Sequence, residues 1–444
     1  MKILHVSLAD PMQHSGGLNR YCREVMEEQA KEHEVYILYP NKSNALKKAK
    51  IKKRSANKYE LMNALPVSIT YGIKDIAKYM RPINKNIFLD WLSNMKFDVI
   101  HIHSLQGIPK EFFVAANELG CKMILTTHDY FGICLKATLL STKHELCEYG
   151  EGLKCAECNY NSGLSSTTQW LIHLKLYQYI KNSKTVKQLK SRLVKNHNNI
   201  NNTAREIDKK YLDKDGYEKL LNYYKQIINY IDIIHCNSPV TYDIYRKFVD
   251  HNKCIMLPIS HKGIKKATHI RKDRNSLNFT YMGGPFLHKG YKVFQNALQI
   301  LDSQGYKNWN AYFYGGEYTD MLNDKRIKYG GMFSKKEASY VWKHTDVLVV
   351  PSQWRETYGF VVQEALYQGI PVICSELVGS KYLVEMLDKC LIFQHDAVGS
   401  LVNAMSYLLE HIDYYDSLIN KIETVNFDAD IKSHVKKISE IYTS

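Results

Sequence analysis

Short apolar runs alternate with helix-like segments along most of the chain, and this alternation restricts the fold more than any other feature. We expect strands at residues 3–7, 35–39, 99–103, 123–127 and 231–236, and again at 278–282, 311–314, 347–350 and 371–374. Buried strands separated by helices imply a parallel sheet that is covered on both faces. Because the pattern occurs twice, the sequence predicts an α/β fold of two doubly wound, Rossmann-like domains.

We place the boundary between these domains at 258–275, a stretch that is rich in Lys, His and Arg and lacks periodic apolar residues. The expected N-terminal domain covers 1–262 with an insertion at 131–205, and the expected C-terminal domain covers 263–427. Residues 428–444 are expected to form a final helix that can pack back on the N-terminal domain. Open α/β sheets bind ligands outside the carboxyl ends of their strands, so we expect the domains to face each other across a ligand-binding cleft.

Length and composition exclude several other classes of protein. The 444 residues suffice for two large domains, and 45% hydrophobic against 24% charged residues is an ordinary globular balance. No apolar run approaches the roughly 20 residues that cross a bilayer, and residues 1–9 are too short for a signal peptide. We therefore expect a cytoplasmic protein whose ten cysteines are reduced thiols or metal ligands.

The net charge of +15 comes from two segments, 42–58 and 159–205, each with eight basic residues and no acidic one. The second segment has the pattern of a basic amphipathic helix. That pattern is equally typical of docking on an anionic membrane surface and of a solvated helix face over the core. We do not expect nucleic acid as a partner, because no helix-turn-helix, zinc-finger or RNA-binding signature accompanies the charge.

The densest chemical signal is the block VLVVPSQWRETYGFVVQEALYQGIPVICS at 347–375. It predicts a buried strand, a loop that contains Glu356, and a helix that begins near Gly359, contains Glu364 and ends at Gly369. Ionised carboxylates accept strong hydrogen bonds from hydroxyl groups. The backbone N–H groups that open such a helix are suited to an anion or a hydroxyl; they belong to Thr357, Tyr358, Gly359 and Phe360.

This block resembles the E-x7-E motif of the retaining glycosyltransferases of family 4, which have the GT-B fold. The resemblance implies a hexosyltransferase-type enzyme in which Glu356 and the helix N-terminus hold the donor sugar and Glu364 holds the ribose. It also implies a front-face mechanism, in which the departing phosphate takes the proton of the acceptor. No cofactor is expected for catalysis.

Two further loops resemble other parts of the family pattern. Gly16 and Gly17 follow the first strand, where glycine lets the backbone approach a diphosphate. In the second domain, YMGGPFLHKG at 281–290 resembles the diphosphate-binding loop, with Lys289 in the position of the family's lysine. An ammonium group there would neutralise the departing nucleoside diphosphate. By resemblance, Met332 lies where relatives hold the base.

The segment TTHDYFGICLKATLL at 126–140 resembles the HD pair of a subgroup of the family. The resemblance places His128 near the anomeric carbon or outer hydroxyls of the donor sugar, and has Asp129 orient His128 or contact the acceptor. A helix-capping His-Asp pair is the alternative. His103, at the end of an expected strand, either faces the cleft or is a buried histidine with its hydrogen bonds satisfied.

Four cysteines follow the HD pair, as they do in the subgroup that the chain resembles. Four thiolates can hold a structural zinc ion tetrahedrally, although the spacing is irregular for a known zinc ribbon. Packed reduced thiols are the alternative. The residues are Cys134, Cys147, Cys155 and Cys158.

Together, these features predict a retaining glycosyltransferase that moves a sugar from a UDP- or GDP-sugar to a hydroxyl acceptor. The two basic segments favour a lipid-linked or polysaccharide acceptor in surface glycan biosynthesis, with the enzyme peripheral on the inner face of the membrane. A phosphorylase of the same fold and a non-catalytic glycan- or nucleotide-binding protein are the alternatives.

Overall fold

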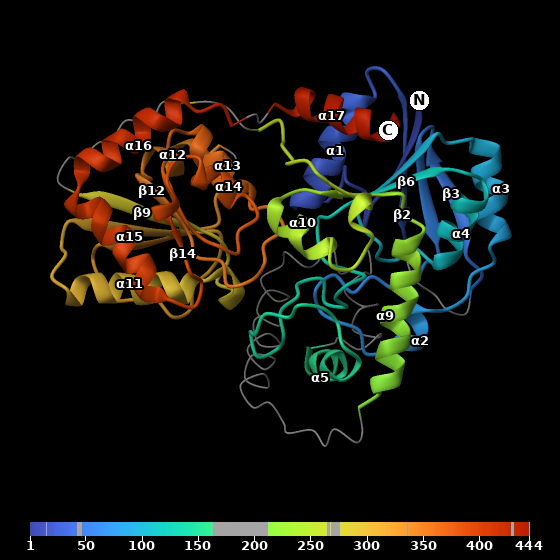
Figure 1. The fold of residues 1–444 in the computed structure, drawn as a ribbon, viewed down its shortest axis with the longest axis horizontal. Helices are drawn as coiled ribbons and strands as arrows, with labels where there is room; N and C mark the ends of the chain where they lie inside the picture. Colours follow the sequence, from blue (N-terminus) through green and yellow to red (C-terminus); the bar gives the residue numbers. More distant parts are fainter. Residues whose placement is uncertain are drawn as a thin grey trace. The chain divides into compact units, whose positions relative to one another are not determined.

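A computed structural model describes residues 1–14, 16–41, 47–162, 212–263, 267, 276–334, 336–427 and 430–443. The chain forms two compact units (Figure 1). Unit 1 comprises Met1–Cys236, Ile244–Ile255 and Ile438–Ser444, and unit 2 comprises Asn237–Asp243 and Met256–Lys437. The end of the C-terminal helix therefore belongs to unit 1.

Unit 1 is built on an eight-stranded sheet of order β3-β4-β2-β1-β5-β6-β7-β8. Neighbouring strands from β4 to β7 pair in parallel, and β3 pairs antiparallel with β4. The strands are β1 (Lys2–Val6), β2 (Glu34–Pro40), β3 (Lys50–Ser55), β4 (Lys58–Met62), β5 (Val99–Ile102), β6 (Lys122–Thr126), β7 (Ile233–Cys236) and β8 (Cys254–Met256).

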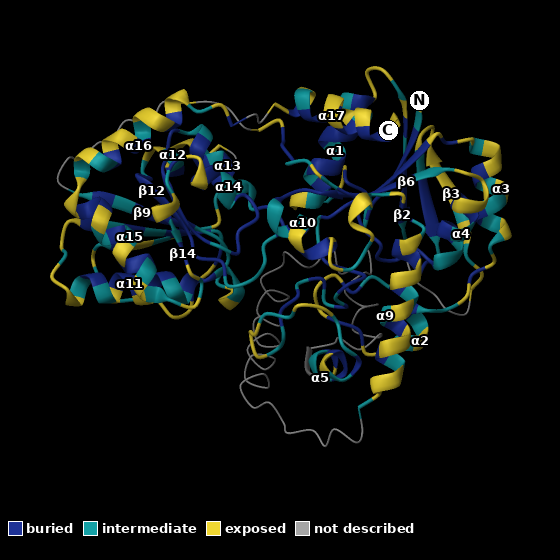
Figure 2. Cartoon of the chain, in the orientation of Figure 1, coloured by how far each residue is buried: buried dark blue, intermediate teal, exposed yellow. Residues whose placement is uncertain are grey.

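Helices cover this sheet because their apolar residues recur on one face. In α1 the buried Tyr21, Cys22, Val25 and Met26 follow helical spacing, and every residue of β5 is buried. Helix α9 likewise has both buried and exposed residues along its length (Figure 2). The helices that begin in unit 1 are α1 (Gly17–Gln29), α2 (Ile76–Tyr79), α3 (Asn86–Met95), α4 (Lys110–Glu118), α5 (Gly152–Ser162) and α9 (Lys214–Asn229). Helix α10 (Pro239–Tyr245) follows β7.

Unit 2 is built on a six-stranded sheet of order β11-β10-β9-β12-β13-β14, in which every neighbouring pair is parallel. Aromatic residues such as Phe279, Phe294 and Trp309 fill its core between the sheet and the helices. The strands are β9 (Leu277–Met282), β10 (Trp309–Tyr314), β11 (Ile327–Gly331), β12 (Val347–Val350), β13 (Val372–Ser375) and β14 (Ile392–Phe393). The helices are α11 (Tyr291–Ser303), α12 (Ala338–Lys343), α13 (Phe360–Tyr367), α14 (Lys381–Glu385), α15 (Val398–Glu410), α16 (Ile412–Thr424) and α17 (Ile431–Thr443).

The strand pairing of unit 2 brings two predicted site loops to one edge of the sheet. Strands β9 and β12 are parallel neighbours, with Phe279 opposite Val347. The loop with Lys289 follows β9 and the loop with Glu356 follows β12, so both leave the sheet at its carboxyl edge. The fold thus brings together two loops that are far apart in the sequence.

The two basic segments are only partly described. Residues 47–58 form the edge strand β3 and the turn into β4, which the sequence did not predict. Most of the basic amphipathic helix expected within 159–205 lies outside the described residues. No helix in the described ranges has the length and apolar character required to span a bilayer.

Gly290 holds the two loops of unit 2 at close range. It has a φ of +80°, and a Cβ added to it would lie 1.6 Å from the carbonyl oxygen of Pro351. Gly305 has a similar φ of +92°, but no atom lies within 4 Å of its added Cβ. The two glycines therefore share a backbone constraint, and only Gly290 adds a steric one.

We predict that Gly290→Ala lowers the free energy of unfolding by about 3 kcal/mol or more, because it combines left-handed strain with a backbone clash. The matched Gly305→Ala variant should lose only about 1 kcal/mol, from the strain alone. Urea unfolding of both variants measures the difference. Equal losses of unfolding free energy in the two variants would show that the clash at Gly290 adds no cost, and would contradict the prediction.

Candidate functional site

The loop between β12 and α13 carries Glu356 and is fixed to the chain that follows β13. The N–H group of Glu356 donates to the carbonyl of Leu377 at 3.0 Å, and the N–H group of Gly379 donates to the carbonyl of Glu356 at 2.9 Å. Glu356 and Val378 thus form a parallel bridge outside the named strands. The position of Glu356 is therefore set by the backbone of two neighbouring loops.

The Glu356 carboxylate is paired with Lys289. The Lys289 Nζ lies 2.6 Å from Oε1 of Glu356, and the Ser352 hydroxyl donates to Oε2 at 2.8 Å. Burial disfavours the charged carboxylate, but Lys289 and Ser352 outweigh it and hold the pKa of Glu356 below its ordinary value. The Nζ also lies 5.2 Å from the centre of the Trp354 ring. Two loops thus place a fixed cation beside an ionised carboxylate.

Glu364, on the second turn of α13, lies beside a residue that the sequence did not indicate. The Nε2 of His261 lies 3.0 Å from Oε1 of Glu364, and the Nδ1 of His261 accepts from the N–H group of Gly263. Because Nδ1 accepts, Nε2 carries the proton. Nε2 makes no hydrogen bond within the described residues, so its contact with the carboxylate is close but not aligned for one. The His261 side chain is fully buried, while Glu364 is 29% exposed. A buried imidazole therefore lies next to a partly exposed carboxylate.

The residues that open α13 use their carbonyl groups for internal bonds. Ser380 donates through its N–H group to the Tyr358 carbonyl at 2.7 Å and through its hydroxyl to the Gly359 carbonyl at 3.0 Å. Gly359 has a φ of +89° and caps the helix, which begins at Phe360. The side chains of Thr357 and Tyr358 are buried. The first N–H groups of an α-helix such as α13 have no carbonyl partner within the helix.

Met332 follows β11 and is 74% exposed. The preceding Gly331 has a φ of +67°, and the ring of the following Phe333 packs edge-on against Tyr314. Whether this segment holds a base stays a prediction. The Met332 side chain is accessible enough to contact a nucleotide base.

In unit 1, the predicted phosphate loop ends in the helix N-cap Gly16, which has a φ of +113°. Its carbonyl accepts the first backbone hydrogen bond of α1, from the N–H group of Arg20 at 2.9 Å. Gly17 is the first helical residue. An α1 N-terminus without a side-chain cap follows directly after the glycine turn, which is the backbone arrangement that suits an anion.

His128 and Asp129 follow β6 and are partly buried. The Nε2 of His128 lies 3.2 Å from Nδ1 of His103, and the ring of Tyr21 packs edge-on against His128. Burial and the neighbouring His235 lower the pKa of His128 to about 3, so that it is neutral at pH 7. His103 is 1% exposed and bonded on both sides, which settles it as a buried histidine.

Asp129 has the opposite shift from Glu356. Burial raises the pKa of Asp129 to about 6, although the N–H group of Phe131 donates to its Oδ1 at 2.8 Å. The backbone carbonyl of Asp129 accepts from the Tyr245 hydroxyl at 3.0 Å. No lysine or arginine is among the causes of the shift of Asp129. This carboxyl therefore changes its charge close to physiological pH.

The four cysteines that follow the HD pair gather around the start of α5. Cys155 and Cys158 lie one turn apart on α5, and burial together with the thiols of Cys134, Cys158 and Cys147 raises the pKa of the Cys155 thiol. In the part of the chain that the structure describes, the group with three ligand atoms within 4.8 Å of one another is a different one, His5, Cys22 and His103. Zinc at the four cysteines stays a prediction.

The predicted residues thus form two groups. Unit 2 brings Lys289, Ser352 and Glu356 together and pairs Glu364 with His261. Unit 1 brings His128 together with His103 and Tyr21. His261, Ser352 and Trp354 were missed by the sequence analysis. Only Ser352 and Trp354 had a signal, since both lie within the 347–375 block.

Two family comparisons match the chain. Residues 264–425 match the group 1 glycosyl transferases, and residues 15–150 match glycosyltransferase family 4. An uncharacterised 41.2 kDa protein in the cps region of Klebsiella pneumoniae is 28% identical over 117 residues, 26% of this chain and 32% of that protein. The match therefore spans about a third of the length of this curated relative.

Solved structures resemble the whole chain at low sequence identity. HepE of Anabaena in complex with UDP has 11% identity and a TM-score of 0.58, with 100% of both chains covered. The apo form of the lipopolysaccharide outer core galactosyltransferase WaaB has 12% identity and a TM-score of 0.58, with 100% of this chain and 99% of that chain covered. These likenesses confirm the expected fold class, two parallel α/β domains of the GT-B type.

The raised pKa of Asp129 predicts a stability that depends on pH. Its folded pKa of about 6 exceeds the ordinary value of 3.8, so the stabilising contribution is complete below 3.8 and is lost as the pH rises through 6. Asp129→Asn does not titrate. The free energy of unfolding of Asp129→Asn, relative to that of the natural chain, should therefore rise by up to about 3 kcal/mol from pH 4 to pH 7. Urea unfolding at both pH values measures this, with Asp90→Asn on the exposed side of α3 as the control. A difference that is equal at both pH values would contradict it.

Proposed function

We propose that this chain, a GT-B glycosyltransferase of the family 4 class, transfers a sugar from a nucleotide-diphosphate donor to a hydroxyl acceptor with retention of configuration. The observation that carries the proposal is the Lys289–Glu356 pair at the carboxyl edge of the unit 2 sheet, beside the N-terminus of α13. This edge is where open α/β sheets bind ligands.

Lys289 is suited to the diphosphate of the donor. Its ammonium group is held at 2.6 Å by Glu356 before any donor binds, so little reorganisation is needed when negative charge develops on the departing phosphate. Glu356 is ionised at neutral pH because its pKa is lowered, and it can accept hydrogen bonds from sugar hydroxyls. The N–H groups that open α13 add partial positive charge next to both.

Glu364 is suited to the ribose diol. The buried His261 lies 3.0 Å from one carboxylate oxygen, and the partial exposure of Glu364 leaves the carboxylate in reach of solvent. Among the similar structures, HepE of Anabaena was solved with UDP and with UDP-glucose. These complexes support a uridine or related nucleotide sugar as donor, and we propose a UDP- or GDP-hexose for this chain.

In the proposed step, the bond between the anomeric carbon and the diphosphate oxygen breaks while the acceptor oxygen bonds to the same face of that carbon. The acceptor proton moves to the departing phosphate oxygen, so no side chain acts as nucleophile. His128, neutral at pH 7, would hydrogen-bond the donor sugar from unit 1, and Asp129 would orient it or contact the acceptor. The helix α1 N-terminus after Gly16 would contribute to the diphosphate site.

The acceptor is proposed to be a lipid-linked or polysaccharide glycan. The relative in the cps region of Klebsiella pneumoniae and the lipopolysaccharide galactosyltransferase support a role in surface glycan biosynthesis. The edge strand β3 supports binding to an anionic membrane surface, because its Lys50, Lys52 and Lys53 are exposed. The neighbouring Arg54 is paired with Glu60 and adds less positive charge.

Loss of either member of the ion pair should abolish transfer while the fold survives. Lys289→Ala and Glu356→Gln should each lower the rate at least about 100-fold, the cost of removing a group that stabilises developing charge. Lys292→Ala is the matched control, because Lys292 is a partly exposed lysine of α11 that pairs with Asp320. Donor hydrolysis and transfer are measured across a panel of nucleotide sugars. Near-wild-type turnover in either variant contradicts the assignment, and cleavage of an oligosaccharide that requires inorganic phosphate would favour a phosphorylase.

The basic edge strand predicts binding to anionic vesicles. Each exposed lysine near an anionic surface contributes about 1 kcal/mol, so alanine at Lys50, Lys52 and Lys53 should weaken binding on the order of 100-fold. Alanine at Lys325, Lys336 and Lys343, three exposed lysines of unit 2, is the control. Co-sedimentation with phosphatidylserine and phosphatidylcholine vesicles measures this. Equal binding to both kinds of vesicle rules out the proposed docking.

A further inference from the structure

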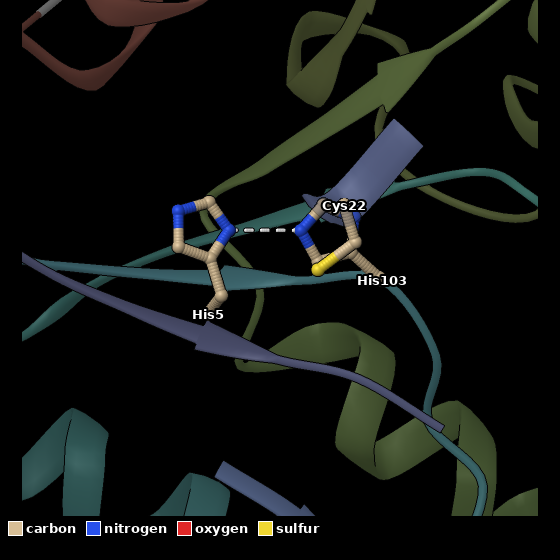
Figure 3. A group of neighbouring side chains, drawn as sticks. All are labelled: His5, Cys22 and His103. Carbon is tan, nitrogen blue, oxygen red and sulfur yellow. Dashed lines mark hydrogen bonds between the residues drawn. The ribbon is translucent and has the colours of Figure 1, made fainter. Parts of the chain in front are cut away.

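A buried cluster of nitrogen and sulfur ligands lies between the unit 1 sheet and α1. His5 on β1, Cys22 on α1 and His103 after β5 are 0%, 0% and 1% exposed. One ring nitrogen of each histidine and the Cys22 Sγ all lie within 4.8 Å of one another (Figure 3). In unit 1, these side chains form a group distinct from the four cysteines that follow the HD pair.

The sequence explains why the three side chains meet. His5 pairs with His101 in the parallel register of β1 and β5, and His103 lies two residues further along, so all three point to the same face of the sheet. Cys22 lies on the buried face of α1, in one apolar cluster with Met26 and three residues of β2. The helix therefore places a thiol over the two imidazoles.

The outer nitrogen of each imidazole already has a partner. The Nε2 of His5 lies 2.8 Å from Oε1 of Gln29, an amide oxygen that can only accept, so this nitrogen carries the proton and Nδ1 does not. The Nδ1 of His103 lies 3.2 Å from Nε2 of His128. The inner nitrogens, Nδ1 of His5 and Nε2 of His103, lie 2.9 Å apart. Metal-binding histidines typically have this arrangement, with the outer nitrogen held by a hydrogen bond.

The Cys22 thiol also has a polar neighbour, the hydroxyl of Ser7. The hydroxyl of Ser7 is fully buried and has no hydrogen-bond partner within the described part of the chain. It lies against Cys22: burial raises the pKa of the Cys22 thiol, and the neighbouring Ser7 hydroxyl partly opposes that rise. A buried hydroxyl without a partner is costly. A thiolate at Cys22 would accept its proton and remove that cost.

We propose that His5 Nδ1, Cys22 Sγ and His103 Nε2 bind a zinc-class metal ion. Two imidazoles and one thiolate, with no carboxylate, suit Zn²⁺ and disfavour Mg²⁺ and Ca²⁺. A tetrahedral zinc site spaces its nitrogens a few tenths of an ångström further apart than 2.9 Å, which small side-chain movements supply. The ion takes the place of the hydrogen bond between the two histidines.

Binding has a defined proton balance. Burial lowers the pKa of His5 to about 4 and holds the pKa of His103 well below its ordinary value, so both rings are neutral at pH 7 and release no proton on that account. The Cys22 thiol loses its proton to solvent as the Zn–S bond forms. The proton of His103 then resides on Nδ1 and is donated to His128, so the ion fixes the tautomer of His128. Metal binding itself does not depend on sugar transfer.

Zinc content of the full chain tests the site. Cys155→Ala/Cys158→Ala serves as the background, because it removes half of the competing cysteine ligands. After loading with Zn²⁺ and gel filtration, we expect one equivalent per chain, lost when Cys22→Ala is added and kept when Cys374→Ala is added. Cys374 is the matched control because it is fully buried in the core of unit 2. One equivalent retained in the Cys22→Ala variant overturns the proposal.

X-ray absorption of the natural chain loaded with one equivalent of Co²⁺ gives an answer that does not depend on any variant folding. A coordination shell of nitrogen with about one sulfur per ion supports the proposed site. A shell of sulfur alone would assign the metal to the four cysteines, and a shell without sulfur would show adventitious binding. Either of the last two results overturns the proposal.

Discussion

The ion pair between Lys289 and Glu356 is the contact on which the candidate site of unit 2 depends. It joins the loop after β9 to the loop after β12, two strands that are parallel neighbours, and it keeps a largely buried carboxylate ionised. A buried charge without its partner is strongly destabilising, so the lysine fixes both the position and the ionisation of the glutamate. Gly290, next to Lys289, allows the approach because its missing side chain leaves room for the Pro351 carbonyl.

Unit 1 shows a different use of burial. His5, His101 and His103 occupy one face of β1 and β5, where apolar residues would ordinarily pack. Their hydrogen bonds form one connected network with Gln29, Tyr442 and Thr126. Because Tyr442 lies near the end of α17, the last residues of the chain are part of the core of unit 1. These hydrogen bonds constrain the tautomer of each histidine.

The sequence predicted what depends on local pattern and missed what depends on contacts across the chain. The strands around 347–375 and the start of α13 followed from apolar runs and one glycine, and the structure confirms them. The pairing of His261 with Glu364 spans about 100 residues of sequence and follows no periodicity, so no pattern could indicate it. The β3–β4 hairpin was missed because the exposed lysines of β3 lack the apolar alternation of a half-buried strand. The arrangement of the four cysteines could not be predicted either, because it depends on the path of the loop between them.

Glu356 in unit 2 and Asp129 in unit 1 are both acidic, but their surroundings shift their pKa values in opposite directions. Glu356 has a cation at 2.6 Å and a hydroxyl at 2.8 Å, so its pKa is lowered and it stays an acceptor throughout the physiological range. Burial raises the pKa of Asp129 to about 6, although neutral groups donate hydrogen bonds to it. Opposite shifts of two similar groups typically mark different roles. A permanently charged carboxylate suits the binding of hydroxyl groups, whereas a carboxyl that titrates near pH 6 suits a position where a proton is gained or lost. Asp129 is therefore a residue whose protonation makes the stability of unit 1 depend on pH.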